Sequence, residues 1–262
     1  MKPLSGHWNG PSDKLRRISI IIPTFNEAMM IKDCLNQFEP FSERVAGTRQ
    51  SGILRRPDET PEPAEVIVVD GGSNDNTAQI VKSYPQVRYI EHDKRGRAAQ
   101  MNAGAAVASG DIFLFLHADT RLPDRWSTHV TESIYHRGMS GGRFRFDIAN
   151  QKRIYRWIVR GTNFRSRILG ITYGDQAIYA RRATFETLGG YHKISVFEDS
   201  GFADRLKKIG GLDWIDDPIL TSARRWEKRG PIRTVLLTWL LRTLYTLYVP
   251  PNFLARFYGV TR

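Results

Sequence analysis

Hydrophobic residues in the first half of the chain gather in short unbroken runs, with amphipathic stretches between them. The runs are rich in Val and Ile and do not alternate with polar residues, which is typical of strands buried on both faces of a parallel sheet. They predict strands at residues 18–22, 65–70, 87–90 and 112–116. Helical periodicity predicts helices between them, at residues 27–38, 75–83 and 96–108. We therefore expect an α/β fold with a single, mostly parallel central sheet flanked by helices.

The pattern changes after Gly141. Residues 142–148 alternate polar and apolar side chains, as in a half-exposed strand, and residues 152–160 predict a basic, aromatic helix. We interpret this second half as the other wall of a cleft in the same domain.

A further helix in this half is expected to begin at Glu198. Its predicted core face carries Phe202, Leu206 and Ile209.

The predicted organisation is one domain with two appendages. The domain covers residues 17–230, after a flexible tail at residues 1–16. Residues 42–63 contain arginines, glutamates and three prolines but few apolar side chains, so we expect a surface loop there. Residues 231–262 are predicted to form a C-terminal amphipathic helix and tail.

Small polar and acidic residues follow three of the predicted strands. They are Pro23, Thr24, Asn26 and Glu27 after the first strand, Asp70 and Gly71 at the second, and His117, Ala118 and Asp119 after the fourth. Open α/β sheets bind ligands at the carboxyl ends of their strands, so these clusters together predict a nucleotide site. Each cluster alone is equally consistent with a turn that caps a helix.

Asp119 is the candidate metal ligand. A carboxylate just past a buried strand suits Mg²⁺ or Mn²⁺, which prefer oxygen ligands and bind through few protein groups plus substrate phosphates. His117, two residues earlier, is either a second ligand or a hydrogen-bond partner of a diphosphate. The alternative is a turn-capping aspartate beside a buried, satisfied histidine.

Glu198 and Asp199 open a predicted helix. The helix dipole and free backbone N–H groups stabilise anions at that end, so we expect both carboxylates to be ionised. An ionised carboxylate in a cleft is a usable general base toward a hydroxyl. The commoner use of such a pair is helix capping.

Basic side chains supply candidate anion ligands. Arg97 opens a helix of small residues, where an anion would meet both the guanidinium and the helix N-terminus. Arg225 and Trp226 pair a phosphate-binding group with a ring that can line a sugar pocket. Paired arginines alone are more often a solvated surface.

Charge and composition indicate which kinds of molecule the protein binds. The 262-residue chain has a net charge of +12 and a single cysteine, Cys34, which we expect in the core. Residues 151–182 and 221–262 each carry eight lysines or arginines against one acid, which favours phosphorylated molecules, an anionic bilayer or nucleic acid. No nucleic-acid-binding motif accompanies this charge, so nucleic acid is disfavoured. The polar N-terminus has no apolar signal stretch, so we expect a cytoplasmic location.

In combination, these motifs resemble the family 2 glycosyltransferases, which have the GT-A fold. The matching blocks are Pro23 to Glu27, Val68 to Ser73, Asn102, His117 to Asp119, Glu198-Asp199 and Arg225-Trp226. More narrowly, the chain resembles short bacterial transferases named for arsenosugar biosynthesis or as carotenoid (diaponeurosporenoate) glycosyltransferases. This subgroup shares the blocks Arg95 to Asn102, Leu116 to Thr120, Gly174-Asp175-Gln176 and Ser222 to Trp226.

The resemblance implies a nucleotide-sugar donor, a UDP-sugar by preference, and inversion at the anomeric carbon. It implies that Thr24, Glu27 and Asp70 hold the base and ribose, that Arg97 approaches the donor, and that Asp119 holds the metal. Asp199, with Glu198 beside it, would deprotonate the acceptor, and Arg225 and Trp226 would steady the diphosphate and sugar. Pro23, Asn26, Gly71, Asn102, His117 and Ala118 are assigned to the donor side, and Gly174, Asp175 and Gln176 to the acceptor side.

Two departures from the family pattern shape the expected activity. The usual Asp-x-Asp is His117-x-Asp119 here, which leaves the metal's identity open, and Ser222 replaces the Gln of processive members. The sequence also lacks the long membrane spans of polymer-exporting synthases. We therefore expect one sugar to be transferred to a hydroxyl of a small or lipidic acceptor.

The C-terminal helix, residues 232–249, is apolar around most of its circumference. It is too short for a membrane span and carries Arg242 near its middle. Basic flanks and aromatic residues suit an anionic membrane interface, which would make the protein peripheral on the inner face of the membrane. The alternatives are packing on its own domain or a homodimer.

Two other function classes compete with the transferase. A nucleotidyltransferase would want a glycine-rich basic loop after the first strand, which Pro23 to Glu27 do not provide. A protein that keeps the fold and binds membranes or polyanions without turnover remains the non-enzymatic alternative.

Overall fold

The computed structural model describes residues 17–38, 65–93 and 96–258. The predicted tail at 1–16 and the whole predicted loop at 42–63 lie outside the described residues. Eight strands form one sheet with the order β3-β2-β1-β4-β7-β6-β8-β5. The strands are β1 (Ile18–Thr24), β2 (Glu65–Asp70), β3 (Val87–Glu91), β4 (Ile112–Phe115), β5 (Thr120–Arg121), β6 (Gly141–Ile148), β7 (Tyr179–Arg181) and β8 (Asp213–Thr221).

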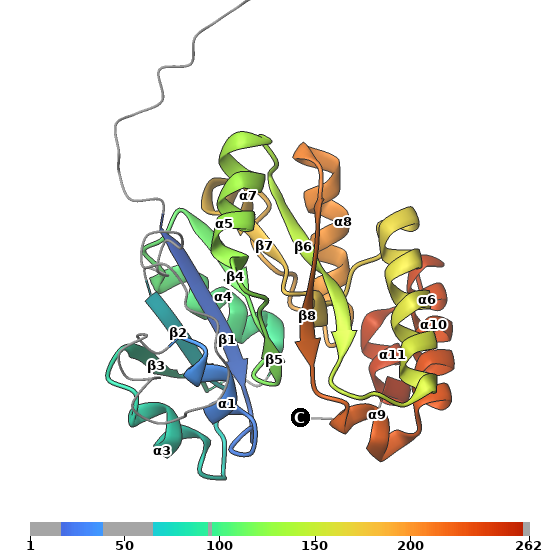
Figure 1. Ribbon diagram of the computed structural model, residues 1–262, viewed down its shortest axis with the longest axis horizontal. Coiled ribbons are helices and arrows are strands. Elements are labelled where there is room, and N and C mark those ends of the chain that lie inside the picture. The colour runs from blue at the N-terminus through green and yellow to red at the C-terminus, as the bar shows by residue number, and fades with distance from the viewer. Residues whose placement is uncertain (1–16, 39–64, 94–95, 259–262) are drawn as a thin grey trace, which may run out of the picture.

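Helices cover both faces and one end of this sheet (Figure 1). They are α1 (Ile31–Asn36), α3 (Thr77–Lys82), α4 (Arg97–Val107), α5 (Trp126–Thr131), α6 (Arg153–Leu169), α7 (Arg182–Thr187), α8 (Glu198–Gly210), α9 (Arg224–Arg229), α10 (Pro231–Thr246) and α11 (Pro251–Tyr258). A π-helical turn, η1 (Glu132–His136), continues α5, and a 3₁₀ turn, η2 (Gly174–Gln176), precedes β7. The predicted α/β architecture is confirmed.

The first four strands are parallel, and their register aligns the predicted site. Thr24 pairs with Asp70 across β1 and β2, and Ile21 pairs with Phe115 across β1 and β4. The carboxyl ends of these strands therefore meet at one edge, as the sequence predicts. The side chains of β1, β2 and β4 are almost entirely buried because helices pack on both faces.

The second half of the sheet is mixed. β7 runs antiparallel to both β4 and β6, β8 is parallel to β6, and β5 is antiparallel to β8. The register of β6 and β8 shifts between Phe144 and Arg145, opposite the segment of β8 that contains Pro218. Because a proline cannot donate to the ladder, Pro218 makes the sequence pattern of β8 atypical of a strand.

Two apolar layers enclose the parallel strands. On one face, α1, α3 and α5 pack through Ile31, Val81 and Val130. On the other face, α4 and α8 pack through Met101, Phe202 and related side chains. Cys34 is buried in the first layer, as expected.

Three sequence expectations about the second half need correction. The strand at 142–148 is more buried than its alternation indicates, because the polar Arg143 is also buried and donates to Ser166 of α6. The helix predicted at 152–160 continues to Leu169. Ile209 is 53% exposed and outside the core, because it lies in the last turn of α8, which ends at Gly210.

Helix α4 lies unusually close to the sheet because it carries Gly104. A Cβ at this position would lie 2.5 Å from Ile21 Cγ2, whereas a Cβ on Gly161 of α6 would meet nothing within 4 Å. We therefore expect Gly104→Ala to lower the free energy of unfolding by about 1–3 kcal/mol through overpacking. Gly161→Ala is the matched control and is expected to raise it by about 0.5–1 kcal/mol through helix propensity. Urea unfolding measures both, and equal shifts in the two variants would contradict the close packing of α4.

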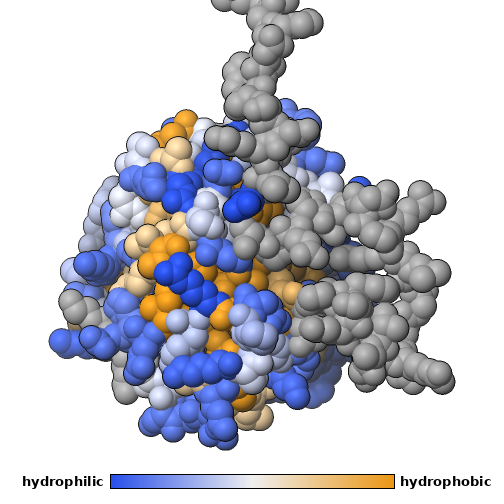
Figure 2. Space-filling model, turned by 90° about the vertical axis from the view of Figure 1, so that its left-hand side faces the viewer, coloured by the Kyte–Doolittle hydropathy of each residue, from blue (hydrophilic) through white to orange (hydrophobic). Residues whose placement is uncertain are grey.

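Strand β3 is one edge of the sheet, and Figure 2 shows the face on that side of the molecule. Hydrophilic residues surround and cross the apolar patch in its centre. Arg88 and Glu91 of β3 are exposed, and charges of this kind discourage pairing with another chain.

The C-terminal helices extend the domain beyond β6 (Figure 1). Leu241 of α10 and Leu254 of α11 form a core with Val196 and Phe197, so part of this segment packs on its own domain. Arg242 is buried and pairs with Asp204 of α8 at 2.8 Å. In the described part of the chain, every helix is too short or too polar to cross a bilayer.

Candidate functional site

Hydrogen bonds tie the loops after β1 and β2 into one rim. The backbone N–H of Asn26 donates to Ser73 Oγ at 2.8 Å, and Asn26 Oδ1 accepts from the N–H of Asn74 at 2.9 Å. The N–H of Glu27 donates to Thr77 Oγ1 at 2.8 Å. Asn26 adopts a left-handed conformation with φ 55°, which asparagine tolerates better than most residues. The two predicted clusters therefore converge at the sheet edge.

Asp70 lies beneath this rim and is almost fully buried. Its Oδ1 accepts from Ser73 Oγ at 2.5 Å, and its Oδ2 accepts from the Tyr89 hydroxyl at 3.1 Å. Burial and the nearby Asp70 carboxylate raise the pKa of Tyr89 to about 12, so the tyrosine remains a donor. Protein donors thus orient the carboxylate of Asp70.

A cleft of about 760 Å³ opens above the carboxyl ends of the strands. We use "the cleft" for this cavity throughout. Twelve of the predicted site residues line it: Pro23, Thr24, Asn26, Glu27, Gly71, Arg97, His117, Asp119, Asp175, Asp199, Arg225 and Trp226. Asp119 and Asp199, from opposite halves of the chain, therefore face a shared space.

Cationic side chains outnumber acidic ones in the lining of the cleft. They are Arg97, Arg165, Arg224, Arg225, Lys228 and Arg229. Arg224 also donates to Glu27 Oε2 at 2.6 Å, which joins α9 to the β1 rim. Guanidinium groups bind phosphate oxygens in a bidentate manner, so this wall suits a diphosphate.

Asp199 is held at the start of α8 by backbone donors. Its Oδ2 accepts from the N–H of Gly174 at 2.5 Å, and its Oδ1 accepts from the N–H of Ser200 at 2.6 Å. A Cβ on Gly174 would lie 2.8 Å from His117 Nε2 and 3.0 Å from Asp199 Oδ2. Glycine at position 174 thus lets the imidazole and the carboxylate approach the same backbone.

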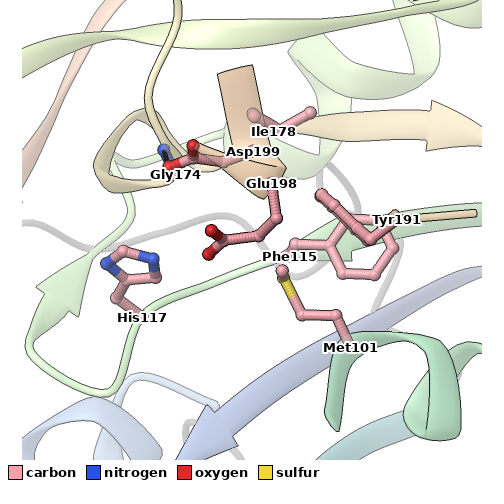
Figure 3. Close-up of a pocket in the computed structure, with 8 residues that line it drawn as sticks. All are labelled: Met101, Phe115, His117, Gly174, Ile178, Tyr191, Glu198 and Asp199. Carbon is pink, nitrogen blue, oxygen red and sulfur yellow. Dashed lines mark hydrogen bonds between the residues drawn. The ribbon is translucent and has the colours of Figure 1, made fainter. Parts of the chain in front are cut away.

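Glu198 lies deeper than Asp199, in a small cavity of about 10 Å³ beside the cleft. Figure 3 shows its carboxylate pointing toward the His117 ring, with Asp199 next to Gly174. Arg97 Nε lies 2.7 Å from Glu198 Oε1, which links the start of α4 to the start of α8. Burial raises the pKa of Glu198 against the opposing effect of Arg97. This shift opposes the stabilised anion that the sequence predicts at position 198.

The donor set around Asp119 fits a hard divalent cation. The described residues contain no cluster of three or more His, Cys, Asp or Glu ligands. Asp119 and His117 both line the cleft, as its arginines do. Mg²⁺ binds through one or two protein groups with waters and substrate phosphates, so a carboxylate with an imidazole nearby is sufficient when the diphosphate is bound.

Asp175 is half-buried in the wall of the cleft. Its Oδ1 is buried and has no hydrogen-bond partner among the described residues. Burial, with a contribution from Asp199, raises its pKa from 3.8 to about 6, against the attraction of Arg225 and Arg165. A carboxyl group with an unused oxygen at this place is suited to contact a ligand.

The raised pKa of Asp175 predicts a pH-dependent stability. Between about pH 4 and pH 6 the folded protein keeps a proton that the unfolded chain releases, so the free energy of unfolding falls as pH rises through this window. Asp175→Asn removes the effect. We expect the free energy of unfolding of the variant, relative to that of wild type, to rise by up to about 3 kcal/mol from about pH 4 to pH 8. Urea unfolding at both pH values tests this, and a difference independent of pH would contradict it.

Four predicted residues line neither of the two cavities described above. They are Asp70, Asn102, Ala118 and Gln176. The side chain of Asn102 donates to the Tyr191 carbonyl and accepts from its N–H, so it positions the segment before α8. Gln176 is fully buried between Ser166 and the Phe144 carbonyl. The predicted direct contacts of Asn102 with the donor and of Gln176 with the acceptor stay predictions.

Sequence reasoning did not assign several residues of the cleft, among them Gln100, Arg165 and Arg224. Gln100 donates to the carbonyls of both Thr24 and Val69, and so joins α4 to the ends of β1 and β2. Arg224 precedes the predicted Arg225, and Arg165 reaches the cleft from α6. The Arg95-to-Asn102 block contained the signal for Gln100. No pattern distinguishes Arg165 from the exposed arginines of its helix.

Similarity to known proteins agrees with this geometry. The sequence profile of "Glycosyl transferase family 2" matches residues 19–188. Glycosyltransferase AglE of Haloferax volcanii is 27% identical over 205 residues, covering 75% of this chain and 59% of AglE. The succinoglycan biosynthesis protein ExoA of Rhizobium meliloti is 26% identical over 79% of this chain and 63% of its own length. The chain thus spans less than two thirds of these relatives.

Solved structures show the same fold at low identity. The mannosyltransferase PcManGT from Pyrobaculum calidifontis, in complex with GDP-Man and Mn²⁺, has a TM-score of 0.60 and 21% identity, covering 92% of this chain and 68% of that one. These neighbours confirm the GT-A fold that the motifs predict. Since the family profile covers more than half of the sequence, the chain belongs to glycosyl transferase family 2.

Proposed function

We propose that this protein is an inverting glycosyltransferase that moves one sugar from a nucleotide-diphosphate sugar, a UDP-sugar by preference, to a hydroxyl of a small or lipidic acceptor. The observation that carries the proposal is the shared cleft, which Asp119, the arginines and Asp199 all line. A reaction that breaks a sugar–phosphate bond needs positive charge at the leaving group and a base toward the acceptor. The cleft supplies both.

In the proposed reaction, Asp199 accepts the proton of the acceptor hydroxyl. The acceptor oxygen forms a new bond to the anomeric carbon on the face opposite the nucleotide, and the bond from that carbon to the diphosphate oxygen breaks. The nucleoside diphosphate leaves with the bonding electrons. The backbone donors Gly174 and Ser200 keep the Asp199 carboxylate in place while each oxygen retains a lone pair for this proton.

We assign binding of the nucleotide-sugar donor to the loops after β1 and β2 and to the arginines of the cleft. Thr24, Glu27 and Gly71 would contact the base and ribose, and Asp70 would support them from below. Arg97, Arg225 and Trp226 would hold the diphosphate and sugar. Asp119, with His117, would hold Mg²⁺ or Mn²⁺, which when bound neutralises charge on the diphosphate.

Calorimetric titration with UDP, GDP and CDP, each with and without Mn²⁺, tests the donor class. We expect one diphosphate to bind more tightly than the others and to require the metal. Absence of binding by any of them, with the protein folded, would remove the nucleotide-sugar proposal. The anomeric configuration of the product, read by NMR, tests inversion separately.

A further inference from the structure

Exposed apolar side chains concentrate on the three helices at one end of the domain. Twelve of the fifteen exposed large apolar side chains among the described residues lie on α6, α10 and α11 or directly after α10. Trp157 is 69% exposed, Phe164 71% and Leu247 67%. Contiguous apolar surface of this kind on a polar protein marks an interaction site.

The spacing of these residues places them on one stripe of each helix. On α6 the stripe contains Trp157, Phe164 and Ile168, at intervals of seven and four residues. On α10 it contains Ile232, Leu236 and Leu240, and Leu247 directly follows the helix. Intervals of three, four and seven residues return to the same side of an α-helix.

The three helices are packed together, so their stripes belong to one region. Val235 of α10 packs against the core that contains Tyr155 and Ile158 of α6. Leu241 of α10 and Leu254 of α11 share another core. Figure 1 shows α6, α10 and α11 side by side at the end of the molecule away from β3.

The charged side chains exposed on these three helices are all basic. The exposed basic residues of the three helices are Arg153, Arg156, Arg160, Arg167, Arg233 and Arg256, and the helices contain no aspartate or glutamate. A second copy of the chain docked through this region would bring the same arginines together across a two-fold axis. An anionic lipid surface instead complements both the arginines and the apolar stripes.

We propose that α6, α10 and α11 form a docking surface for an anionic bilayer, with their exposed apolar side chains inserted among the lipid headgroups. The attachment is peripheral, because α10 has 16 residues and contains the buried Arg242. The same three helices supply Arg165, Val235, Trp239 and Ala255 to the cleft. A docked protein therefore has that end of its cleft at the lipid surface. Docking itself does not depend on the proposed sugar transfer.

Flotation with vesicles, without any substrate, tests the docking surface. The full chain is expected to float with vesicles of phosphatidylcholine and phosphatidylglycerol, and to bind pure phosphatidylcholine at least about tenfold more weakly. Binding to the mixed vesicles should weaken at high salt. The double variant Leu236→Glu/Leu240→Glu should lower the affinity by about tenfold or more, because both side chains are exposed and lie outside the cleft lining.

Ile209→Glu is the matched control. Ile209 is also exposed, but it lies at the end of α8, so we expect unchanged vesicle binding. Circular dichroism and nucleoside diphosphate binding check that the double variant is folded. The proposal is overturned if wild type ignores anionic vesicles, or if Ile209→Glu weakens binding as much as the double variant. It is also overturned if sedimentation shows a dimer that the double variant dissociates while vesicles remain unbound.

Discussion

Asp199→Asn is expected to lower kcat for sugar transfer by about 10²–10⁴-fold while nucleoside diphosphate binding survives. The substitution keeps the size of the side chain but removes its capacity to accept the acceptor's proton. The amide oxygen can still accept from one of the two backbone donors, Gly174 or Ser200. Steady-state kinetics with a nucleotide sugar, together with calorimetric titration of the diphosphate, separates the loss of the base from the loss of the donor site.

Asp204→Asn is the matched control for this variant. Asp204 lies on the same helix, is 43% exposed and pairs with Arg242 outside the cleft. We expect its transfer rate to stay close to that of wild type. An unchanged rate in Asp199→Asn would remove Asp199 from its role as base. A similar loss in both variants would point to a general disturbance of α8.

The parallel half of the fold can be predicted from sequence because three of its strands, β1, β2 and β4, are buried on both faces. Runs of Val and Ile at 20–22 and 66–69 belong in a core, and the structure pairs them in parallel. Glycine and polar residues then mark where each strand ends. The position of Asp119 relative to Asp70 follows from this regularity.

The mixed half was harder to predict because its strands are short or interrupted. β7 has three residues, β5 has two, and β8 contains Pro218. Such segments owe their pairing to neighbours far away in the chain and carry little periodicity of their own. The sequence also predicts too early an end for α6, because Arg165 and Arg167 interrupt the apolar residues of its last turns.

At the site too, the local motif can be predicted from sequence, whereas the packing that holds it in place cannot. Glu198 and Asp199 were identified from their place at a helix start, whereas their separation in depth depends on tertiary packing. Phe197 adopts φ 63° and packs against Tyr245 of α10 with ring centroids 5.3 Å apart. The C-terminal helix therefore supports the start of α8, which no local pattern indicates.

Asp119→Ala is expected to abolish the metal dependence of nucleoside diphosphate binding. Asp119 is the carboxylate assigned to the cation, with His117 also in the cleft lining, so removing the carboxylate leaves an imidazole, which prefers softer metals to Mg²⁺. Calorimetric titration of UDP with and without Mn²⁺ should show a clear difference for wild type and none for the variant. Residual metal-independent binding through Arg97 and Arg225 is expected to remain.

Asp111→Ala serves as the control, because Asp111 is an exposed carboxylate remote from the cleft lining. It should keep the wild-type metal dependence. His117→Ala distinguishes the two readings of the histidine: a ligand would weaken the metal effect, whereas a diphosphate contact would weaken binding equally with and without metal. If Asp119→Ala retains metal-dependent binding, the metal assignment is wrong, and charge at the leaving group must come from the arginines of the cleft.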